Sequence, residues 1–346
     1  MRLLVATDAA APQVNGVVRT LDETAAALAR VGVQTTFLTP AAFAAAPMPT
    51  YPEIRLSFAT AGRVASFVQE NGFDAVHVAT EGPIGMAARR FCLRSGLAFT
   101  TSYHTRFPEY LRVRAPIPLA WSYAWLRRFH NAGSATMVST ASLARELESR
   151  GFARLKVWAR GVDTALFRPR SATLDLPRPI FLFVGRLAVE KNLPAFLALD
   201  LPGTKLVVGD GPQRAFLQSA HPDAVFLGLR TGEDLARIFA SADAFVFPSL
   251  TDTYGIVLLE ALASGVPVAA FPAPGPRDVL AGSNVAVLDH DLRGAALAAL
   301  RIPRERCRAF ALRHSWEESA RAFLSHVVPL REPVSTPRAL VLRSAG

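Results

Sequence analysis

Short apolar segments alternate with longer amphipathic segments from the start of the chain. Residues 2–7 form a mostly apolar run, which predicts a buried strand of a parallel sheet. Residues 17–31 carry apolar side chains at helical spacing and are followed by Gly32, a residue type that commonly ends a helix. Residues 33–38 predict the next strand. A strand–helix–strand unit of this kind is typical of doubly wound α/β sheets.

The same alternation continues through the first half of the chain and then begins again. Residues 169–179 hold several prolines and no apolar periodicity, so we expect a linker there. A second set of apolar strands follows, from residues 180–184 to residues 285–288. Residues 304–327 read as one helix, and residues 41–52 read as a flexible loop. The pattern therefore predicts an α/β protein with two Rossmann-like, doubly wound domains.

The composition agrees with two well-packed domains and indicates the cellular compartment of the protein. A length of 346 residues favours two domains, and 51% of the residues are hydrophobic. No apolar run approaches the ~20 residues of a membrane span. The first residues read as a strand rather than a signal peptide. Cys92 and Cys307 lie far apart without metal-ligand spacing, so we expect reduced, buried thiols in a cytoplasmic protein.

The positive charge is concentrated in the first half of the chain. Residues 1–170 hold 20 Arg and Lys against 11 Asp and Glu, a balance of +9, out of +10 for the whole chain. A basic surface of this kind favours an acidic partner, either nucleic acid or an anionic membrane. The chain shows no helix-turn-helix pattern, zinc-ligand spacing or RNA-binding aromatic motif. We therefore expect no nucleic-acid partner.

Residues 106–128 interleave arginines with aromatic residues, including Trp121 and Trp125. Aromatic rings at headgroup level and guanidinium groups on lipid phosphates suit a membrane interface. Pro116 and Pro118 break the segment, so it is not one long helix. The alternative is a core helix with its tryptophans inside and its arginines outside.

Two carboxylates, Asp252 and Glu260, lie eight residues apart where an apolar strand leads through a polar loop into a helix. Residues 251–255 are poor helix formers and residues 256–263 are good ones, which places one acid on the loop and the other on the helix. Two acids so placed can bind separate hydroxyl groups of one extended ligand, and the helix start offers N–H groups to an anion. This layout favours a sugar, a phosphate and a ribose in that order. In the alternative interpretation Asp252 caps the helix and Glu260 lies on a solvated face.

Two cations and one histidine follow other predicted strands. Arg186 and Lys191 lie five residues apart on the loop after residues 180–184. Fixed cations at this place can stabilise the negative charge that a departing diphosphate gathers. The alternative is a solvated surface loop. His104 follows the strand at residues 97–102, at the sheet edge where such folds bind ligands, although a packing histidine would occupy the same position.

The pattern Pro-Ser-x-x-Asp-x-x-Gly-x-x-x-x-Glu-Ala at residues 248–261 resembles the signature of the family 4 retaining glycosyltransferases. That signature is usually Glu-x7-Glu, and Asp252 is one methylene shorter. Gly-Arg-x4-Lys at residues 185–191 is a second close match, and Asn15-Gly16 and His104 support it. The Asp variant is similar to mannosyltransferases that use GDP-mannose.

The resemblance covers residues 1–327 and implies the GT-B fold, in which two Rossmann-like domains face each other across a cleft. Residues 1–168 would form the acceptor-binding domain and residues 169–310 the domain that binds the nucleotide sugar. Residues 311–327 would form a helix that crosses back to the first domain, and residues 328–346 a tail.

The resemblance also implies roles for single residues. Arg186 and Lys191 would stabilise the leaving diphosphate, and Asp252 would bind sugar hydroxyls. His104 would lie near the 6-hydroxyl of the donor sugar and position it without acting as the base. The remaining donor contacts that the resemblance implies are the ribose carboxylate Glu260, the glycine loop at Gly16, the main chain near the base at Leu229, and backbone N–H groups at Tyr254, Gly255 and Ile256.

The expected activity is transfer of a hexose with retention at the anomeric carbon, without a metal or other cofactor. The favoured donor is GDP-mannose, and the acceptor is a lipid or glycan at the inner face of the membrane. Alternatives are a diacylglycerol glycosyltransferase that uses UDP-glucose or UDP-glucuronate, a nucleotide-sugar epimerase, and a non-catalytic nucleotide-sugar-binding protein. Glu81, on another strand-to-helix loop, could meet the acceptor but is more typical of a helix cap.

Overall fold

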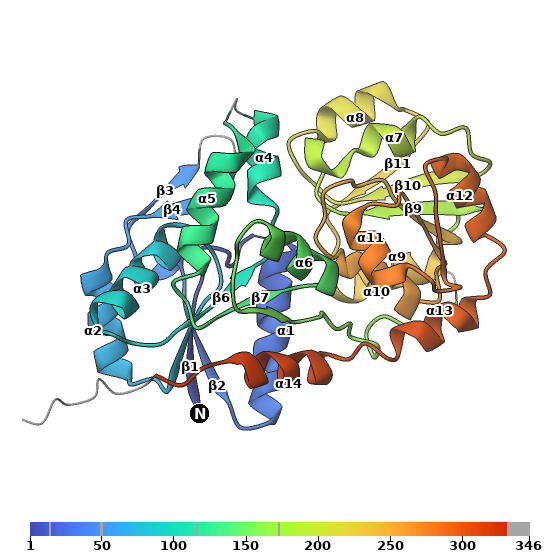
Figure 1. Ribbon diagram of the computed structural model, residues 1–346. Coiled ribbons are helices and arrows are strands. Elements are labelled where there is room, and N and C mark those ends of the chain that lie inside the picture. Colours follow the sequence, from blue (N-terminus) through green and yellow to red (C-terminus); the bar gives the residue numbers. More distant parts are fainter. Residues whose placement is uncertain (14, 49–50, 115–116, 172–173, 331–346) are drawn as a thin grey trace, which may run out of the picture.

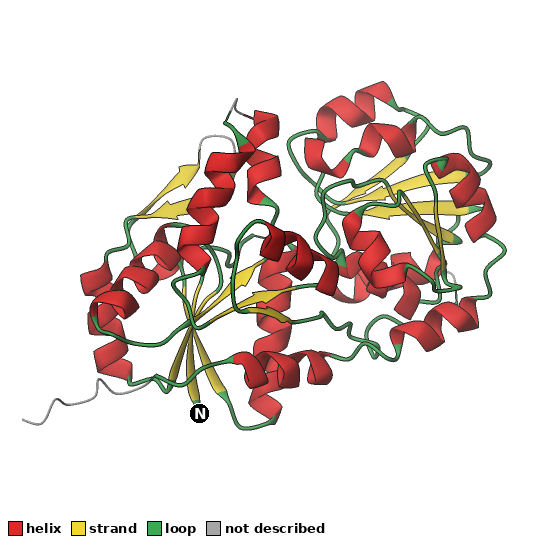
Figure 2. Ribbon diagram, viewed as in Figure 1, coloured by secondary structure: helices red, strands yellow, loops and turns green. Residues whose placement is uncertain are grey.

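The computed structural model describes residues 1–13, 15–48, 51–114, 117–171 and 174–330. The described residues form two lobes, each built on a six-stranded parallel sheet with helices on both faces (Figures 1 and 2). The predicted architecture of two Rossmann-like α/β domains is confirmed. We call them the first lobe and the second lobe in chain order.

The sheet of the first lobe has the strand order β2-β1-β5-β6-β7-β8, and every pair is parallel. Its strands are β1 Arg2–Ala6, β2 Gln34–Leu38, β5 Ala75–Val78, β6 Thr100–Tyr103, β7 Ala135–Val138 and β8 Leu155–Val157. The order reverses between β1 and β5, and ligands bind at such a switch point beyond the carboxyl ends of the strands.

The sheet of the second lobe repeats this plan in the order β11-β10-β9-β12-β13-β14. Its strands are β9 Ile180–Val184, β10 Thr204–Val208, β11 Val225–Gly228, β12 Ala244–Phe247, β13 Val268–Ala270 and β14 Ala286–Leu288. β9 and β12 are buried on both faces and wholly apolar, as expected for the centre of a parallel sheet.

Helices connect successive strands and cover both faces of each sheet (Figure 2). Those of the first lobe are α1 Gly16–Arg30, α2 Ala61–Asn71, α3 Pro83–Arg94, α4 Phe107–Arg114, α5 Leu119–His130 and α6 Ala141–Ser149. Those that follow β9 are α7 Leu193–Leu197, α8 Arg214–Ala220, α9 Gly232–Ser241, α10 Ile256–Ala263, α11 Pro274–Leu280, α12 Leu292–Ala299, α13 Arg304–Ala311 and α14 Trp316–His326. None of the described helices combines the length and the hydrophobicity that a membrane span requires.

The segment that was expected to be one helix over residues 304–327 is two helices. α13 ends at Ala311, and Ser315 caps α14 by accepting a hydrogen bond from the Glu318 N–H at 3.1 Å. The cap competes with a continuous helix because its serine must adopt an extended backbone. α14 then crosses back and packs against α1 of the first lobe (Figure 1). The Trp158 indole N–H fixes it by donating to the Ser319 hydroxyl at 3.0 Å.

Two smaller features complete the first lobe. The flexible loop expected over residues 41–52 is wrong for the described part of that range: a 3₁₀ turn at Pro40–Ala42 leads into an antiparallel hairpin of β3 Ala45–Met48 and β4 Tyr51–Ser57. At the chain's other end, the Leu330 N–H donates to the Asp74 carbonyl at 2.7 Å, and the remainder of the expected tail lies outside the described residues.

Candidate active site

Lys191 and Asp252, which the sequence assigns to the same ligand, lie in contact. The Lys191 Nζ is 2.6 Å from Asp252 Oδ1 and 2.9 Å from Oδ2. Lys191 ends the 3₁₀ turn η2 (Val189–Lys191), and Asp252 lies on the loop between β12 and α10. The hydroxyls of Ser249 and Thr251 both donate to the Glu190 carbonyl, at 3.3 and 3.4 Å, and so tie the two loops together. A cation and a carboxylate are therefore held side by side at the carboxyl edge of the second sheet.

Arg186 lies on the same loop as Lys191, two residues after β9. The loop is anchored on both sides of it, because the Gly185 N–H donates to the Val208 carbonyl at 3.0 Å and the Leu187 N–H donates to the Asp210 carbonyl at 2.9 Å. Leu229 follows β11 at the same edge of the sheet and is exposed. The structure thus places Arg186, Lys191 and Leu229 along one edge, as the sequence assignment requires.

Glu260 lies at the centre of α10 and is 1% exposed. Its carboxylate forms an ion pair with Arg19 of α1, in the other lobe, although neither oxygen accepts a hydrogen bond of good geometry within the described residues. Burial raises the pKa of Glu260 above its ordinary value, and Arg19 acts in the opposite direction. The alternative interpretation that Glu260 lies on a solvated face is wrong. A buried carboxylate with unfilled acceptor positions can accept hydrogen bonds from ligand hydroxyls.

The turn that opens α10 requires a glycine. Gly255 has φ +81°, and an added Cβ would lie 3.2 Å from both Phe247 and Leu258 side-chain atoms. Within the part of the chain that the structure describes, no side chain caps the first N–H groups of α10, whose first residue is Ile256. Tyr254 is buried, and its hydroxyl donates to the Arg160 carbonyl of the first lobe at 3.2 Å. The helix start that the sequence assigns to donor binding is open for an anion.

His104 lies one residue beyond β6 and touches the loop that carries Asp252. The Thr253 hydroxyl donates to the His104 carbonyl at 2.8 Å, and the Thr253 carbonyl accepts from the Ser139 hydroxyl at 3.1 Å. Arg160 approaches the imidazole itself, with Nη2 3.3 Å from Nδ1. Burial lowers the pKa of His104 well below its ordinary value, and the charge of Arg160 adds to this effect. His104 is therefore a neutral imidazole at the junction of the lobes.

The glycine loop before α1 differs from the expectation in detail. The side chain of Asn15 caps α1, accepting from the N–H groups of Val17 at 3.0 Å and Val18 at 3.1 Å. Gly16 has open space where a Cβ would stand. Two of the N–H groups that could bind an anion at this helix start are thus already satisfied by the protein.

Glu81 does not cap α3, contrary to the expectation from sequence. Asp8 caps it instead, accepting from the N–H groups of Ile84 at 2.9 Å and Gly85 at 3.4 Å. Asp8 reaches this position because β1 and β5 are neighbours in the sheet. Glu81 pairs with the buried His130, whose Nε2 lies 3.1 Å from Glu81 Oε1.

Sequence reasoning also missed Arg19, Arg160 and Thr253. Each joins groups that are far apart in the chain, and none belongs to a short motif. Trp121 was singled out from the sequence, with burial in a core helix as the alternative to a membrane interface. It is 73% exposed on α5, so the alternative of a core helix with its tryptophans inside is wrong for this residue.

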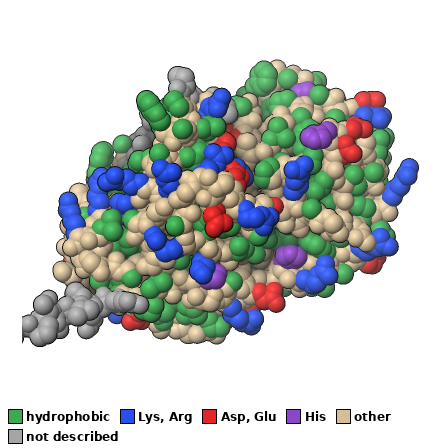
Figure 3. Space-filling view, viewed as in Figure 1, with side chains coloured by type: hydrophobic (Ala, Val, Ile, Leu, Met, Phe, Trp, Pro, Cys, Tyr) green, Lys and Arg blue, Asp and Glu red, His purple; other side chains and the backbone are tan. Residues whose placement is uncertain are grey.

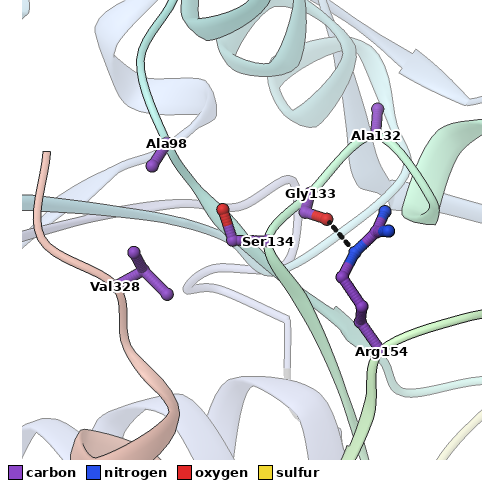
Figure 4. A pocket seen from close by; sticks show the side chains of 6 residues that line it. All are labelled: Ala98, Ala132, Gly133, Ser134, Arg154 and Val328. Atoms are coloured by element: carbon purple, nitrogen blue, oxygen red, sulfur yellow. Dashed lines mark hydrogen bonds between the residues drawn. The ribbon is translucent and has the colours of Figure 1, made fainter. Parts of the chain in front are cut away.

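Two other features of the described residues do not form a site of this kind. A cavity of about 560 Å³ opens at the amino ends of β6 and β7, on the sheet edge opposite His104 (Figure 4). Arg154, which lines this cavity, donates a hydrogen bond from Nε to the Gly133 carbonyl at 3.0 Å (Figure 4). In the Asp-His-Asp triplet at residues 289–291, Asp291 caps α12 by accepting from the Gly294 N–H at 3.0 Å, and no cluster of His, Cys, Asp and Glu side chains among the described residues could hold a metal ion.

Comparison with known proteins gives the site a family context. The domain profile of Glycosyltransferase Family 4 matches residues 14–166, and that of Glycosyl transferases group 1 matches residues 178–302. A GDP-mannose-dependent alpha-mannosyltransferase of Mycobacterium tuberculosis is 36% identical over 225 residues, covering 62% of this chain and 60% of that protein. Sulfoquinovosyl transferase SQD2 of Arabidopsis thaliana is 31% identical over 259 residues, covering 68% of this chain and 49% of that protein. The matches therefore span only about half to three fifths of these relatives.

The solved structures agree on the fold. Sucrose-phosphate synthase from Thermosynechococcus elongatus superposes with a TM-score of 0.73 at 18% identity, covering 94% of this chain and 97% of that one. At this identity the likeness concerns the fold alone, which is the GT-B arrangement of two Rossmann-like lobes. The two matched domain profiles follow each other in the order of the two lobes, so the chain joins the two domains of a glycosyltransferase, Glycosyltransferase Family 4 followed by Glycosyl transferases group 1.

Proposed function

We propose that the protein is a retaining, metal-independent hexosyltransferase that moves mannose from GDP-mannose to a lipid or glycan acceptor. The observation that carries this proposal is the contact of Lys191 with Asp252, on a loop that Thr253 fastens to His104 of the first lobe. This arrangement supports the proposal, because a cation of the kind that binds a diphosphate and a carboxylate of the kind that binds sugar hydroxyls lie together beside the other lobe. The names of the mycobacterial relatives support the choice of donor.

In the proposed reaction the bond from the anomeric carbon to the diphosphate oxygen breaks, and the acceptor oxygen attacks from the same face. The acceptor hydroxyl loses its proton to an oxygen of the departing phosphate. Arg186 and Lys191 stabilise the charge that grows on the diphosphate, which is an interaction stronger in the transition state than in the ground state. These fixed cations take the place of a divalent metal.

Asp252 and Glu260 hold the two ends of the donor. Lys191 and Asp252 form an ion pair in this structure. When the donor binds, this ion pair is replaced by a contact of Lys191 with phosphate and a contact of Asp252 with sugar hydroxyls. Glu260 accepts hydrogen bonds from ribose hydroxyls in place of its contact with Arg19. Asp252 is one methylene shorter than the glutamate usual in the family. Where its carboxylate does not reach a sugar hydroxyl directly, one water bridges the two.

The acceptor side has the character of a membrane interface. Trp121 and Trp125, which are 73% and 43% exposed, lie four residues apart on one face of α5, and Arg128 continues that face. Figure 3 shows Lys and Arg side chains following one another across the first lobe, with hydrophobic side chains beside them. We place this face against the anionic inner surface of the membrane, where a lipid-linked acceptor would be found.

The donor is tested by thermal-shift titration with GDP-mannose, UDP-glucose and ADP-glucose, followed by turnover with radiolabelled sugar. We expect the largest stabilisation from GDP-mannose, since a ligand that binds only the folded state raises its stability. The label should appear in the acceptor fraction. A larger shift with UDP-glucose would favour the alternative of a glycosyltransferase that uses a UDP-sugar. Label that never leaves the donor would indicate an epimerase, and no shift with any donor would overturn the proposal.

A further inference from the structure

Arg160 is a buried cation without a carboxylate partner among the described residues. It is 4% exposed and lies between Trp158 and Gly161, in the segment that leaves the first sheet. Its guanidinium stacks over the Trp158 ring with Cζ 4.0 Å from the centroid, and Nη1 donates to the Trp158 carbonyl at 2.7 Å. Burial lowers the pKa of Arg160 to about 9. Holding an arginine there is costly, so its contact with His104 calls for a physical explanation.

The contact fixes where the hydrogen of His104 lies. Nη2 of Arg160 is 3.3 Å from Nδ1 of His104. A guanidinium can only donate, so Nδ1 must accept and therefore carries no hydrogen. In a neutral imidazole the hydrogen is then on Nε2. An imidazolium cannot keep this contact, because both of its nitrogen atoms carry hydrogen.

The other ring nitrogen has no acceptor. Nε2 of His104 is buried, and the described residues offer it no hydrogen-bond partner. A buried donor without an acceptor is energetically unfavourable. His104 lies just beyond the carboxyl end of β6, beside the loop that carries Asp252. A ligand oxygen bound between the lobes is therefore the natural acceptor for this N–H group.

We propose that Arg160 is a positioning residue that holds His104 in the tautomer with hydrogen on Nε2, as a fixed donor to an oxygen of the bound sugar nucleotide. The proposal rests on the proposed function for the identity of that ligand. Under it His104 has no basic nitrogen to offer the acceptor. Its lone pair at Nδ1 is taken by Arg160, and its Nε2 carries the hydrogen, so the proton of the acceptor must go elsewhere.

The surroundings of His104 oppose a positive charge on its ring. Burial acts against protonation of His104, and so does the charge of Arg160, which lies against Nδ1. The other titratable groups beside it are His77 of β5 and His130 of α5. His77 is itself held neutral, because burial and the charge of Arg160 lower its pKa to about 3. The second lobe fixes the backbone of the pair, since Thr253 donates to the His104 carbonyl and Tyr254 to the Arg160 carbonyl.

The tautomer can be observed directly by long-range ¹H–¹⁵N NMR of the histidine rings in the full-length protein. The chain holds seven histidines, and the spectrum of His104→Gln identifies the missing signals. We expect a neutral ring with hydrogen on Nε2 that does not titrate between about pH 5 and 8, although a free histidine has a pKa of about 6.5. Hydrogen on Nδ1, or titration near the ordinary pKa, would overturn the proposal. This measurement decides the question even if no donor in the panel is turned over.

Kinetics then test whether Arg160 acts through His104. Arg160→Met should lower kcat about fivefold to tenfold, since one hydrogen bond to the ligand is lost for part of the molecules. Arg160→Lys keeps a donor and should retain the tautomer and most of the activity. The two changes combined form a double-mutant cycle. In a His104→Phe background Arg160→Met should have little further effect, because the contact between Arg160 and His104 is already absent.

An equal loss from Arg160→Met in both backgrounds would show that Arg160 acts independently of His104, and the proposal would fail. Circular dichroism and thermal unfolding of each variant show whether it is folded. If Arg160→Met does not fold, the wild-type spectrum and the Arg160→Lys variant still give a result for or against.

Discussion

The two lobes share a strand order but fill the middle of their sheets differently. In the first lobe, buried strands carry polar side chains that satisfy one another: His77 bonds the hydroxyls of Ser102 at 2.6 Å and Thr100 at 2.8 Å. In the second lobe, the central strands β9 and β12 are wholly apolar. The candidate site residues of the second lobe therefore lie outside its sheet, on loops and on α10, where short motifs carry them. In the first lobe, polar side chains continue through the sheet as far as His104, and they are brought together by contacts between residues far apart in the chain.

The helix starts show the same contrast. Asn15 satisfies two N–H groups at the start of α1, whereas no side chain of the described residues caps α10 after Gly255. A capped start stabilises the fold, and an open one can bind a phosphate. Among the described residues, the second lobe thus leaves the first N–H groups of α10 uncapped by side chains, while the first lobe uses the corresponding groups of α1 for stability.

The largest effect is expected from Lys191→Ala on the donor side. Removal of one group that stabilises a developing negative charge costs about 10²–10³ in kcat. The affinity for the nucleotide diphosphate should fall much less, because the interaction is strongest in the transition state. Initial rates and isothermal titration measure the two quantities separately.

Lys156, an exposed lysine on β8 of the first lobe, provides the matched control. Lys156→Ala should behave like the wild type in both assays. Equal losses of kcat and affinity in Lys191→Ala would mean that Lys191 only binds the donor.

Glu260→Gln should separate ligand binding from stability. Loss of a charged acceptor for ribose hydroxyls should weaken nucleotide binding about tenfold or more. The fold itself should be as stable or more stable, because burial raises the pKa of Glu260 and the neutral amide avoids the buried charge. Thermal shifts with and without GDP measure both effects. A variant that loses stability but keeps its GDP affinity would remove Glu260 from the donor site.

The membrane surface is tested on the acceptor side. Trp121→Ser with Trp125→Ser should reduce sedimentation with anionic liposomes several-fold at low salt, since it removes the exposed aromatic rings of α5. Phe216→Ser, at an exposed phenylalanine on α8 of the second lobe, is the control. Wild-type protein that binds neutral and anionic liposomes equally would contradict the proposed docking.

The smallest effect is expected at the capped helix of the first lobe. Asn15→Ala should lower the free energy of unfolding by about 1 kcal/mol, the usual contribution of such a cap. Denaturant unfolding measures this change. Donor affinity should change less than twofold, because the two capped N–H groups are not available to the donor. A tenfold loss of affinity would place Asn15 in the donor site and weaken the contrast between the helix starts.

The sequence by itself determined the two α/β domains and the loop positions of Arg186, Lys191 and Asp252. These features follow from short-range patterns, since strand and helix periods and motif spacings are written within a few residues of each other. The prediction of a single helix over residues 304–327 is wrong for a reason that is also local. The Ser315 cap interrupts the helix although the apolar pattern continues through it.

Only the tertiary structure decided which groups meet between the lobes. His104 and Arg160 are 56 positions apart in the chain, and Thr253 lies 149 positions from His104. The pairing of Glu260 with Arg19, and the capping of α3 by Asp8 rather than Glu81, likewise depend on how strands and lobes pack. Such contacts are set by the shape of the folded chain, because a hydrogen bond requires atoms to be near in space and leaves no trace in local spacing.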